Sequence, residues 1–259
     1  MPEPPAVLLT SGMAGAAYDW EPVLTALSAP HHVHRLERPG LDGRTPPPGL
    51  PSLHDEADLL SAAADRHGGA VVVAHSVSAL HAEAMGRRHP SSLRALVLLD
   101  PSCGSASPHP EWSLLAAEAL GRHAATCIAP FGPAIWTAGA RAQTSRPLPP
   151  AVRSAGRARF RSPAALTAAW QEYLAFEPML RDLAVLRQRT TFPPVPVWIL
   201  TAVGGMRASA AVRWTRCHTR LARLLGGRHR LLPHSRHQLA WECPDVVVET
   251  IEAATESGR

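Results

Sequence analysis

The sequence predicts an α/β fold built on a six-stranded, mainly parallel sheet, and three observations support this prediction. Short apolar runs recur along the 259 residues, at 6–9, 33–36, 70–74, 95–99, 195–200 and 230–232. Amphipathic stretches separate these runs, and strands that alternate with helices form a parallel sheet covered on both faces. The chain is long enough to bury a sizeable core. Its mean hydropathy of −0.05, with no apolar run near 18 residues, predicts a soluble protein without a membrane span.

Helix signals follow in chain order. Ser52 and Asp55 have capping-box spacing and predict a helix that continues to about Arg66. Ser209 is the expected N-cap of the next-to-last helix. Pro244 is suited to the first turn of the last helix.

One long interval interrupts the alternation of strands and helices. It has no strand-like run but contains three helical patterns, at 111–122, 150–160 and 163–187. We therefore expect a core formed by residues 1–102 and 196–259, with residues 103–195 as a helical lid.

The composition excludes several function classes. All 26 basic residues are Arg, and the formal net charge is +5, yet no nucleic-acid module is present and the aromatic residues do not interleave with the arginines. We expect no nucleic-acid partner and no membrane partner. The N-terminus lacks a basic stretch followed by an apolar helix, which predicts a cytoplasmic protein.

The spacing of the cysteines and histidines does not indicate a metal site. The four cysteines never form a Cys-x-x-Cys pair, so we expect them to be reduced residues of the core. His31, His32 and His34 are close in sequence, but only alternate residues of a strand share a face, and no carboxylate completes the set. We expect no metal site.

A serine stands between a buried strand and the start of a helix, in the sequence VVVAHSVSAL. Such a turn requires small residues two positions before and after Ser76, and Ala74 and Ser78 meet this requirement. The turn would also leave the Val77 N–H at a helix N-terminus, where it can stabilise an oxyanion. The plain alternative is that Ser76 only caps the helix.

Three further segments resemble the α/β-hydrolase fold. Residues 8–15 (LLTSGMAG), followed by Trp20, resemble its first-strand turn, and residues 38–45 (RPGLDGRT) resemble the loop after its next strand. Residues 235–244 (SRHQLAWECP) are similar to its closing segment, where a histidine precedes the final helix. The similarity covers most of the chain outside the lid and is closest to the small esterases and hydroxynitrile lyases.

This resemblance implies a role for several residues. Ser76 would be the nucleophile, and His237 would be the general base that takes its proton. The N–H groups of Met13 and Val77 would form the oxyanion hole. Ser11 stands where the family usually has histidine, so we expect other contacts to hold the loop after the first strand.

The acid of the triad is the largest departure from the family pattern. Most relatives carry it after the next-to-last strand, but residues 183–241 contain neither Asp nor Glu. Asp100 lies at the end of the predicted strand 95–99, where open parallel sheets build their sites. We expect Asp100 to be the acid. The alternative is a structural Asp100 and a Ser–His dyad.

The resemblance implies a serine hydrolase that cleaves an ester or thioester of a small to medium organic acid through a Ser76 acyl-enzyme, without metal or cofactor. Two alternatives stay open: a lyase, cyclase or dehydratase acting on a biosynthetic intermediate, and a degenerate binding protein. The lid aromatics are candidates for contacting the small-molecule substrate: Trp112, Phe131, Trp136, Trp170, Tyr173 and Phe176.

Charge is distributed unevenly along the chain. Residues 103–195 contain ten Arg and five acidic residues, a balance of +5, whereas residues 1–102 contain seven Arg and eleven acidic residues, a balance of −4. One interpretation is a lid that attracts anionic substrates. The other is a solvated arginine-rich surface. The sequence does not set the oligomeric state.

Overall fold

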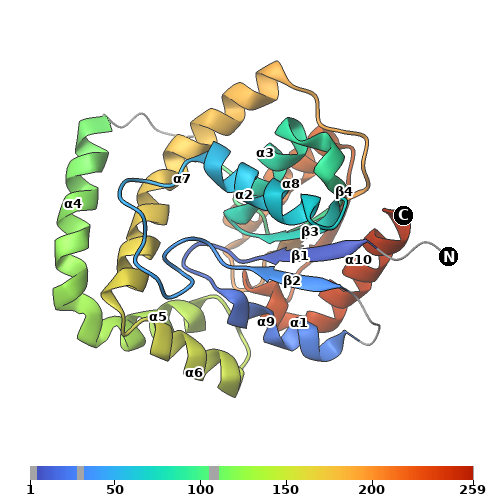
Figure 1. Cartoon of the computed structure of the whole chain (residues 1–259). Helices are drawn as coiled ribbons and strands as arrows, with labels where there is room; N and C mark the ends of the chain where they lie inside the picture. The colour runs from blue at the N-terminus through green and yellow to red at the C-terminus, as the bar shows by residue number, and fades with distance from the viewer. Residues whose placement is uncertain (1–4, 28–31, 105–110, 259) are drawn as a thin grey trace.

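The computed structural model describes residues 5–27, 32–104 and 111–258, and it confirms the α/β fold (Figure 1). Its sheet has six parallel strands in the order β2-β1-β3-β4-β5-β6. The strands are β1 (Ala6–Thr10), β2 (Val33–Leu36), β3 (Ala70–His75), β4 (Leu93–Leu99), β5 (Val197–Ala202) and β6 (Arg228–Leu232). Each predicted strand is present: β2 has the predicted bounds, and the bounds of the other five differ by one or two residues.

Helices cover both faces of the sheet because alternate strand residues point to opposite sides. Leu8, Val72 and Ile199 pack against α2 (Leu53–Asp65), α3 (Ser78–Arg88) and α8 (Ala208–Leu225). Val7, Val73 and Leu200 pack on the other face. The elements there are η1 (Ala17–Trp20), α1 (Glu21–Ala26), α9 (Leu239–Glu242) and α10 (Pro244–Ser257).

Two of the three cap predictions are confirmed. The Ser52 side chain accepts a hydrogen bond from the Asp55 N–H at 3.1 Å, and Pro244 is the first residue of α10. The Ser209 prediction is wrong, because α8 begins at Ala208 with Arg207 as its N-cap. Because the turn after β5 is tight, the helix starts early, and its N-cap lies two residues before Ser209.

In the described part of the chain between β4 and β5, four α-helices lie beyond the carboxyl ends of the strands (Figure 1). They are α4 (Glu111–Ile128), α5 (Gly132–Ala142), α6 (Pro150–Arg159) and α7 (Pro163–Arg189). We call residues 111–189 the helical insertion. Helix α4 lies alongside α7, and α5 lies alongside α6.

The sequence did not predict α5, because its glycines are poor helix formers, although Pro133 is tolerated in a first turn. No helix within the described ranges is long and apolar enough to cross a membrane.

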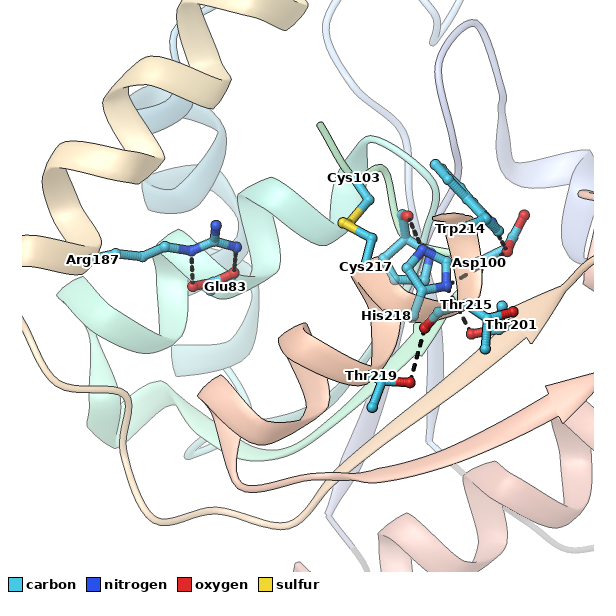
Figure 2. The surroundings of a disulfide bond; sticks show 11 residues. Glu83, Asp100, Cys103, Arg187, Thr201, Trp214, Thr215, Cys217, His218 and Thr219 are labelled. Carbon is cyan, nitrogen blue, oxygen red and sulfur yellow. Dashed lines mark hydrogen bonds and ion pairs between the residues drawn. A yellow bond between two sulfur atoms is a disulfide. The ribbon is translucent and has the colours of Figure 1, made fainter. Parts of the chain in front are cut away.

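Two of the four cysteines are not reduced. Cys103, in the loop after β4, forms a disulfide with Cys217 of α8 (Figure 2). Neighbouring strands bring these segments together, although the cysteines lie 114 residues apart. Cys127 is exposed and Cys243 is partly buried, and both are free thiols. Disulfides persist mainly in oxidising compartments, so this bond weighs against the expected cytoplasmic location.

Candidate active site

The turn between β3 and α3 has the geometry of a nucleophile elbow. Ser76 adopts φ = +56°, a left-handed conformation that is unfavourable for a residue with a side chain. Ala74 and Ser78 are fully buried on either side of it, which explains why both must be small. The Gly12 backbone lies so close that an added Cβ would be 3.0 Å from the Ser76 Cβ.

Ser76, His237 and Asp100 come together in one hydrogen-bonded chain. His237, in the loop between β6 and α9, has its Nε2 3.0 Å from the Ser76 Oγ and its Nδ1 2.6 Å from an Asp100 carboxylate oxygen. Since Asp100 is completely buried and accepts from Nδ1–H, the neutral imidazole would leave Nε2 free to accept the Ser76 proton. The three predicted residues are therefore adjacent and aligned for proton transfer.

Elements of the core hold Asp100. The residue has φ = +42° directly after β4, and its second carboxylate oxygen accepts from the Ala202 N–H at 3.0 Å and from the Trp214 indole at 2.8 Å. Figure 2 shows Trp214 and His218 projecting from α8 beside Asp100. His218 is completely buried, and burial lowers the pKa of its imidazole. A neutral His218 carries no positive charge that would compete with His237 for the Asp100 carboxylate, although its Nδ1 lies 4.0 Å from that group.

The predicted oxyanion donors are both available. Met13 follows β1 and lines the same pocket as Ser76, and Val77 precedes the first turn of α3. Among the described residues, neither backbone N–H donates a hydrogen bond to another protein group. Unpaired backbone N–H groups at such a site can stabilise negative charge that develops on a substrate oxygen.

A buried ion pair supports the loop between β1 and η1, residues 11–16, which carries Met13 and which we call the oxyanion loop. The Arg38 guanidinium donates to the Ser11 carbonyl at 2.5 Å and to the Gly12 carbonyl at 2.6 Å. It also donates to Glu172 of α7 at 2.5 Å, and the second Glu172 oxygen accepts from the Ala14 N–H at 2.7 Å. Burial alone would lower the pKa of Arg38, but the adjacent carboxylate outweighs burial and raises it. Arg38 is therefore a permanent cation that fixes the loop.

Ser78 links this ion pair to the elbow. Its hydroxyl donates to the Ser11 carbonyl and accepts from Arg38 at 2.9 Å and from Thr10 at 3.2 Å. The Ser78 oxygen thus has all its partners within the protein. The loop that lacks the usual histidine at position 11 is held instead by an arginine and a serine hydroxyl.

Ser76 opens into a pocket of about 470 Å³. Its walls come from the oxyanion loop, the loop of His237 and helices α5 and α7. Of the six aromatic candidates, Trp136 lines this pocket.

Two buried titratable groups also line the Ser76 pocket. Burial raises the pKa of Asp19 to about 7 and lowers that of His75 to about 3. The neutral His75 ring donates from Nε2 to the His237 carbonyl at 3.0 Å, which positions the His237 backbone.

The described part of the chain contains no group of three or more His, Cys, Asp and Glu side chains that could hold a metal ion. His34 lies in β2 and stacks on His67, with ring centroids 4.1 Å apart. His31 lies outside the described residues.

A family comparison agrees with this geometry. The model of the alpha/beta hydrolase family matches residues 7–250. The chain belongs to that family. No curated protein matches the sequence significantly.

Solved structures resemble this hydrolase over nearly its whole length. Cfl2 of Burkholderia cenocepacia is 18% identical, with a TM-score of 0.74 over 98% of this chain and 88% of its own. A thermophilic esterase from Thermogutta terrifontis is 19% identical, with a TM-score of 0.68 over 98% and 90%. The haloalkane dehalogenase DbeA of Bradyrhizobium elkani has the same identity and TM-score over 98% and 93%. At such identities the likeness shows the fold alone.

Several residues of the site were not identified from the sequence. In the sequence Arg38 stands out only as part of a family-like loop, and nothing marks Glu172, because its partner lies 134 residues away. Ser102 was also missed, although its hydroxyl is 3.4 Å from the Ser76 Oγ. Nothing local in the sequence marks these contacts.

Proposed function

We propose that this hydrolase is a serine esterase or thioesterase that acts through a Ser76 acyl-enzyme. The observation that supports this most is the chain of short contacts from the Ser76 Oγ through His237 to the buried Asp100, at 3.0 and 2.6 Å. A nucleophile, a base within reach of its proton and a third group that orients the base together form the pattern of nucleophilic catalysis.

Acylation starts when the Ser76 Oγ attacks the carbonyl carbon while His237 Nε2 takes the hydroxyl proton. Negative charge then develops on the carbonyl oxygen, where the N–H groups of Met13 and Val77 stabilise it. Asp100 stabilises the imidazolium. When the tetrahedral intermediate collapses, the bond to the alcohol or thiol breaks and His237 returns the proton to that leaving group.

Deacylation repeats these steps with water. His237 takes a proton from a water molecule as it attacks the acyl carbon, and the Ser76 Oγ leaves with that proton. The organic acid and the free serine are the products. All proton transfers use residues of this chain, so the proposed reaction needs no cofactor.

The chemistry of serine favours acyl transfer among the activities named for the structural neighbours. These neighbours include haloalkane dehalogenases, an esterase and an enol-lactonase. Attack of the Ser76 oxygen on a haloalkane would leave a stable ether, which water could not readily resolve. Attack on an ester or thioester leaves an acyl ester that water can hydrolyse.

We assign the substrate contacts of the proposed enzyme mainly to a lid. Residues 103–195 would form this lid over a core of residues 1–102 and 196–259. The Ser76 pocket is lined from both parts, by Gly12 and His237 of the core and by Trp136 and Phe160 of the insertion. A small-molecule acyl substrate fits a pocket of about 470 Å³.

Labelling with a fluorophosphonate probe tests this function. We expect stoichiometric modification of Ser76, none in Ser76→Ala, and strong loss in His237→Ala. A panel of aryl esters and acyl thioesters measured on the same samples should show turnover that Ser76→Ala abolishes. Full activity in a folded Ser76→Ala protein would refute the proposal.

The same samples separate the two alternatives. A lyase, cyclase or dehydratase would leave the esters intact while converting another substrate. A degenerate binding protein would have an unreactive serine and no turnover with any member of the panel. Ester turnover by wild type together with a reactive Ser76 excludes both.

A further inference from the structure

A second cavity lies within the helical insertion, between α4 and α7. It has a volume of about 480 Å³, and we call it the α4–α7 groove. Its lining is apolar: Ala117, Leu120, Gly121, Ala124, Ala125, Ile128, Ile135, Leu166, Ala169 and Trp170. The one side-chain donor among them is the Trp170 indole, which donates to the Ala117 carbonyl at 2.9 Å. The groove therefore offers a ligand no unpaired polar side chain.

The α4–α7 groove adjoins the Ser76 pocket. Ile135, Leu166 and Ala169 line both cavities. An acyl chain that reached from Ser76 to the groove would therefore pass these three side chains.

At the α4–α7 groove two helices pack closely together, and large apolar side chains that line the groove are exposed. Helix α4 approaches α7 so closely at Gly121 that an added Cβ would lie 2.1 Å from the Trp170 ring. At the rim, Leu120 is 72% exposed and Ile135 is 51% exposed. Large exposed apolar side chains beside a hollow are typical of a surface that buries a ligand.

We propose that the α4–α7 groove binds the hydrocarbon chain of the substrate's acyl group, so that the enzyme prefers esters or thioesters of long-chain carboxylic acids. This inference rests on the proposed function. The acyl group stays on Ser76 through both chemical steps, whereas the alcohol or thiol must leave after the first. A groove between two packed helices is therefore assigned to the acyl group, which stays bound while the leaving group departs.

The expected size of the preference follows from the hydrophobic effect. Burying one methylene contributes about 0.8 kcal/mol, which corresponds to about a fourfold rise in kcat/KM. The rise should continue with each added methylene until the groove is filled and should then stop. An open pocket without a groove would give no such plateau.

The test is a series of 4-nitrophenyl esters from acetate to dodecanoate, assayed on three forms of the full chain. In wild type, kcat/KM should rise about fourfold per methylene before it levels off. Ala124→Trp places an indole inside the groove and should reduce the dodecanoate-to-acetate ratio at least tenfold. Ala119→Trp makes the same substitution at an exposed position of the same helix, outside the groove lining, and should keep the wild-type ratio.

Three outcomes would overturn the inference. They are a flat chain-length profile in wild type, equal ratios in Ala124→Trp and wild type, and a preference that follows the alcohol chain in a matched series of acetate esters. Light scattering adds a fourth: a dimer that Ala124→Trp dissociates would assign the groove to a second copy of the chain. If no ester of any length is cleaved and Ser76 stays unlabelled, the proposed function itself fails. Cleavage of acetate with a flat profile removes the groove inference alone.

Discussion

The two sides of Ser76 are supported in different ways. On the acid side, Asp100 is held by an Ala202 N–H and the Trp214 indole, both from the core, and the Cys103–Cys217 disulfide ties its loop to α8. On the oxyanion side, the loop after β1 is held by Arg38 and by Glu172, and Glu172 belongs to the helical insertion.

This difference determines which part of the site the helical insertion can affect. Neutral donors of the core hold the acid, and a disulfide ties its loop to α8, so no side chain of α7 holds the Asp100 carboxylate. A buried ion pair that bridges core and insertion holds the oxyanion loop. Removing one partner of such a pair leaves an uncompensated charge, which destabilises a protein more than loss of a neutral hydrogen bond. Displacement of α7 would therefore disturb the oxyanion hole before it disturbed the proton relay.

The largest expected effect is on the acid side. Asp100→Asn keeps the shape of the side chain but favours the wrong imidazole tautomer, so we expect kcat to fall about 10⁴-fold with little change in KM. Steady-state kinetics on an aryl ester measures this. A loss below about tenfold, under 1.4 kcal/mol of barrier, would mean that Asp100 is structural and that Ser76 and His237 act as a dyad.

The next effect is on the oxyanion side. Glu172→Gln leaves Arg38 without its counter-charge and disturbs the loop that carries Met13, so kcat should fall about 10²–10³-fold. The free energy of unfolding should fall by about 3 kcal/mol. Kinetics and urea unfolding measure the two changes.

Glu83 provides a matched control for this prediction. Its carboxylate is also buried and pairs with Arg87 at 2.9 Å and with Arg187 of α7 at 2.6 Å, the latter contact shown in Figure 2. Glu83→Gln should lower stability to a similar degree while kcat stays at the wild-type value. Equal losses of kcat in the two variants would show that the Glu172 effect is general destabilisation.

A smaller effect is expected from Trp214→Phe. This change removes one neutral donor to Asp100 and leaves the Ala202 N–H in place. We expect kcat to fall about tenfold, equivalent to about 1.4 kcal/mol, with no change in chain-length preference. A loss as large as that of Asp100→Asn would show that the indole, and not the carboxylate as such, determines the geometry of the acid.

The smallest effect concerns the charge difference between the insertion and the first half of the core. If the arginine-rich residues 103–195 attract anionic substrates, kcat/KM for a carboxylate-bearing ester should fall about threefold between low and high salt. A neutral ester of the same shape should not change. Equal salt dependence for the two esters would leave the arginines as a solvated surface.

Local patterns in the sequence predicted the sheet, the elbow around Ser76 and the place of Asp100 at a strand end, whereas the role of His237 came from the resemblance to the α/β hydrolases. Strand periodicity and the small neighbours of Ser76 are visible within a few residues, so these features can be recognised without a structure. The Arg38–Glu172 pair and the disulfide depend on residues more than 100 positions apart, and nothing local marks them. Helix α5 was missed because tertiary packing outweighs its weak helical propensity.

Partitioning of the acyl group between water and methanol tests the central claim most directly. Three esters of one acid, with 4-nitrophenol, phenol and ethanol as leaving groups, should give the same ratio of free acid to methyl ester, because all pass through the same Ser76 acyl-enzyme. This holds whichever step limits the rate. A ratio that changes with the leaving group would mean that water attacks the substrate directly, and the covalent mechanism would be wrong.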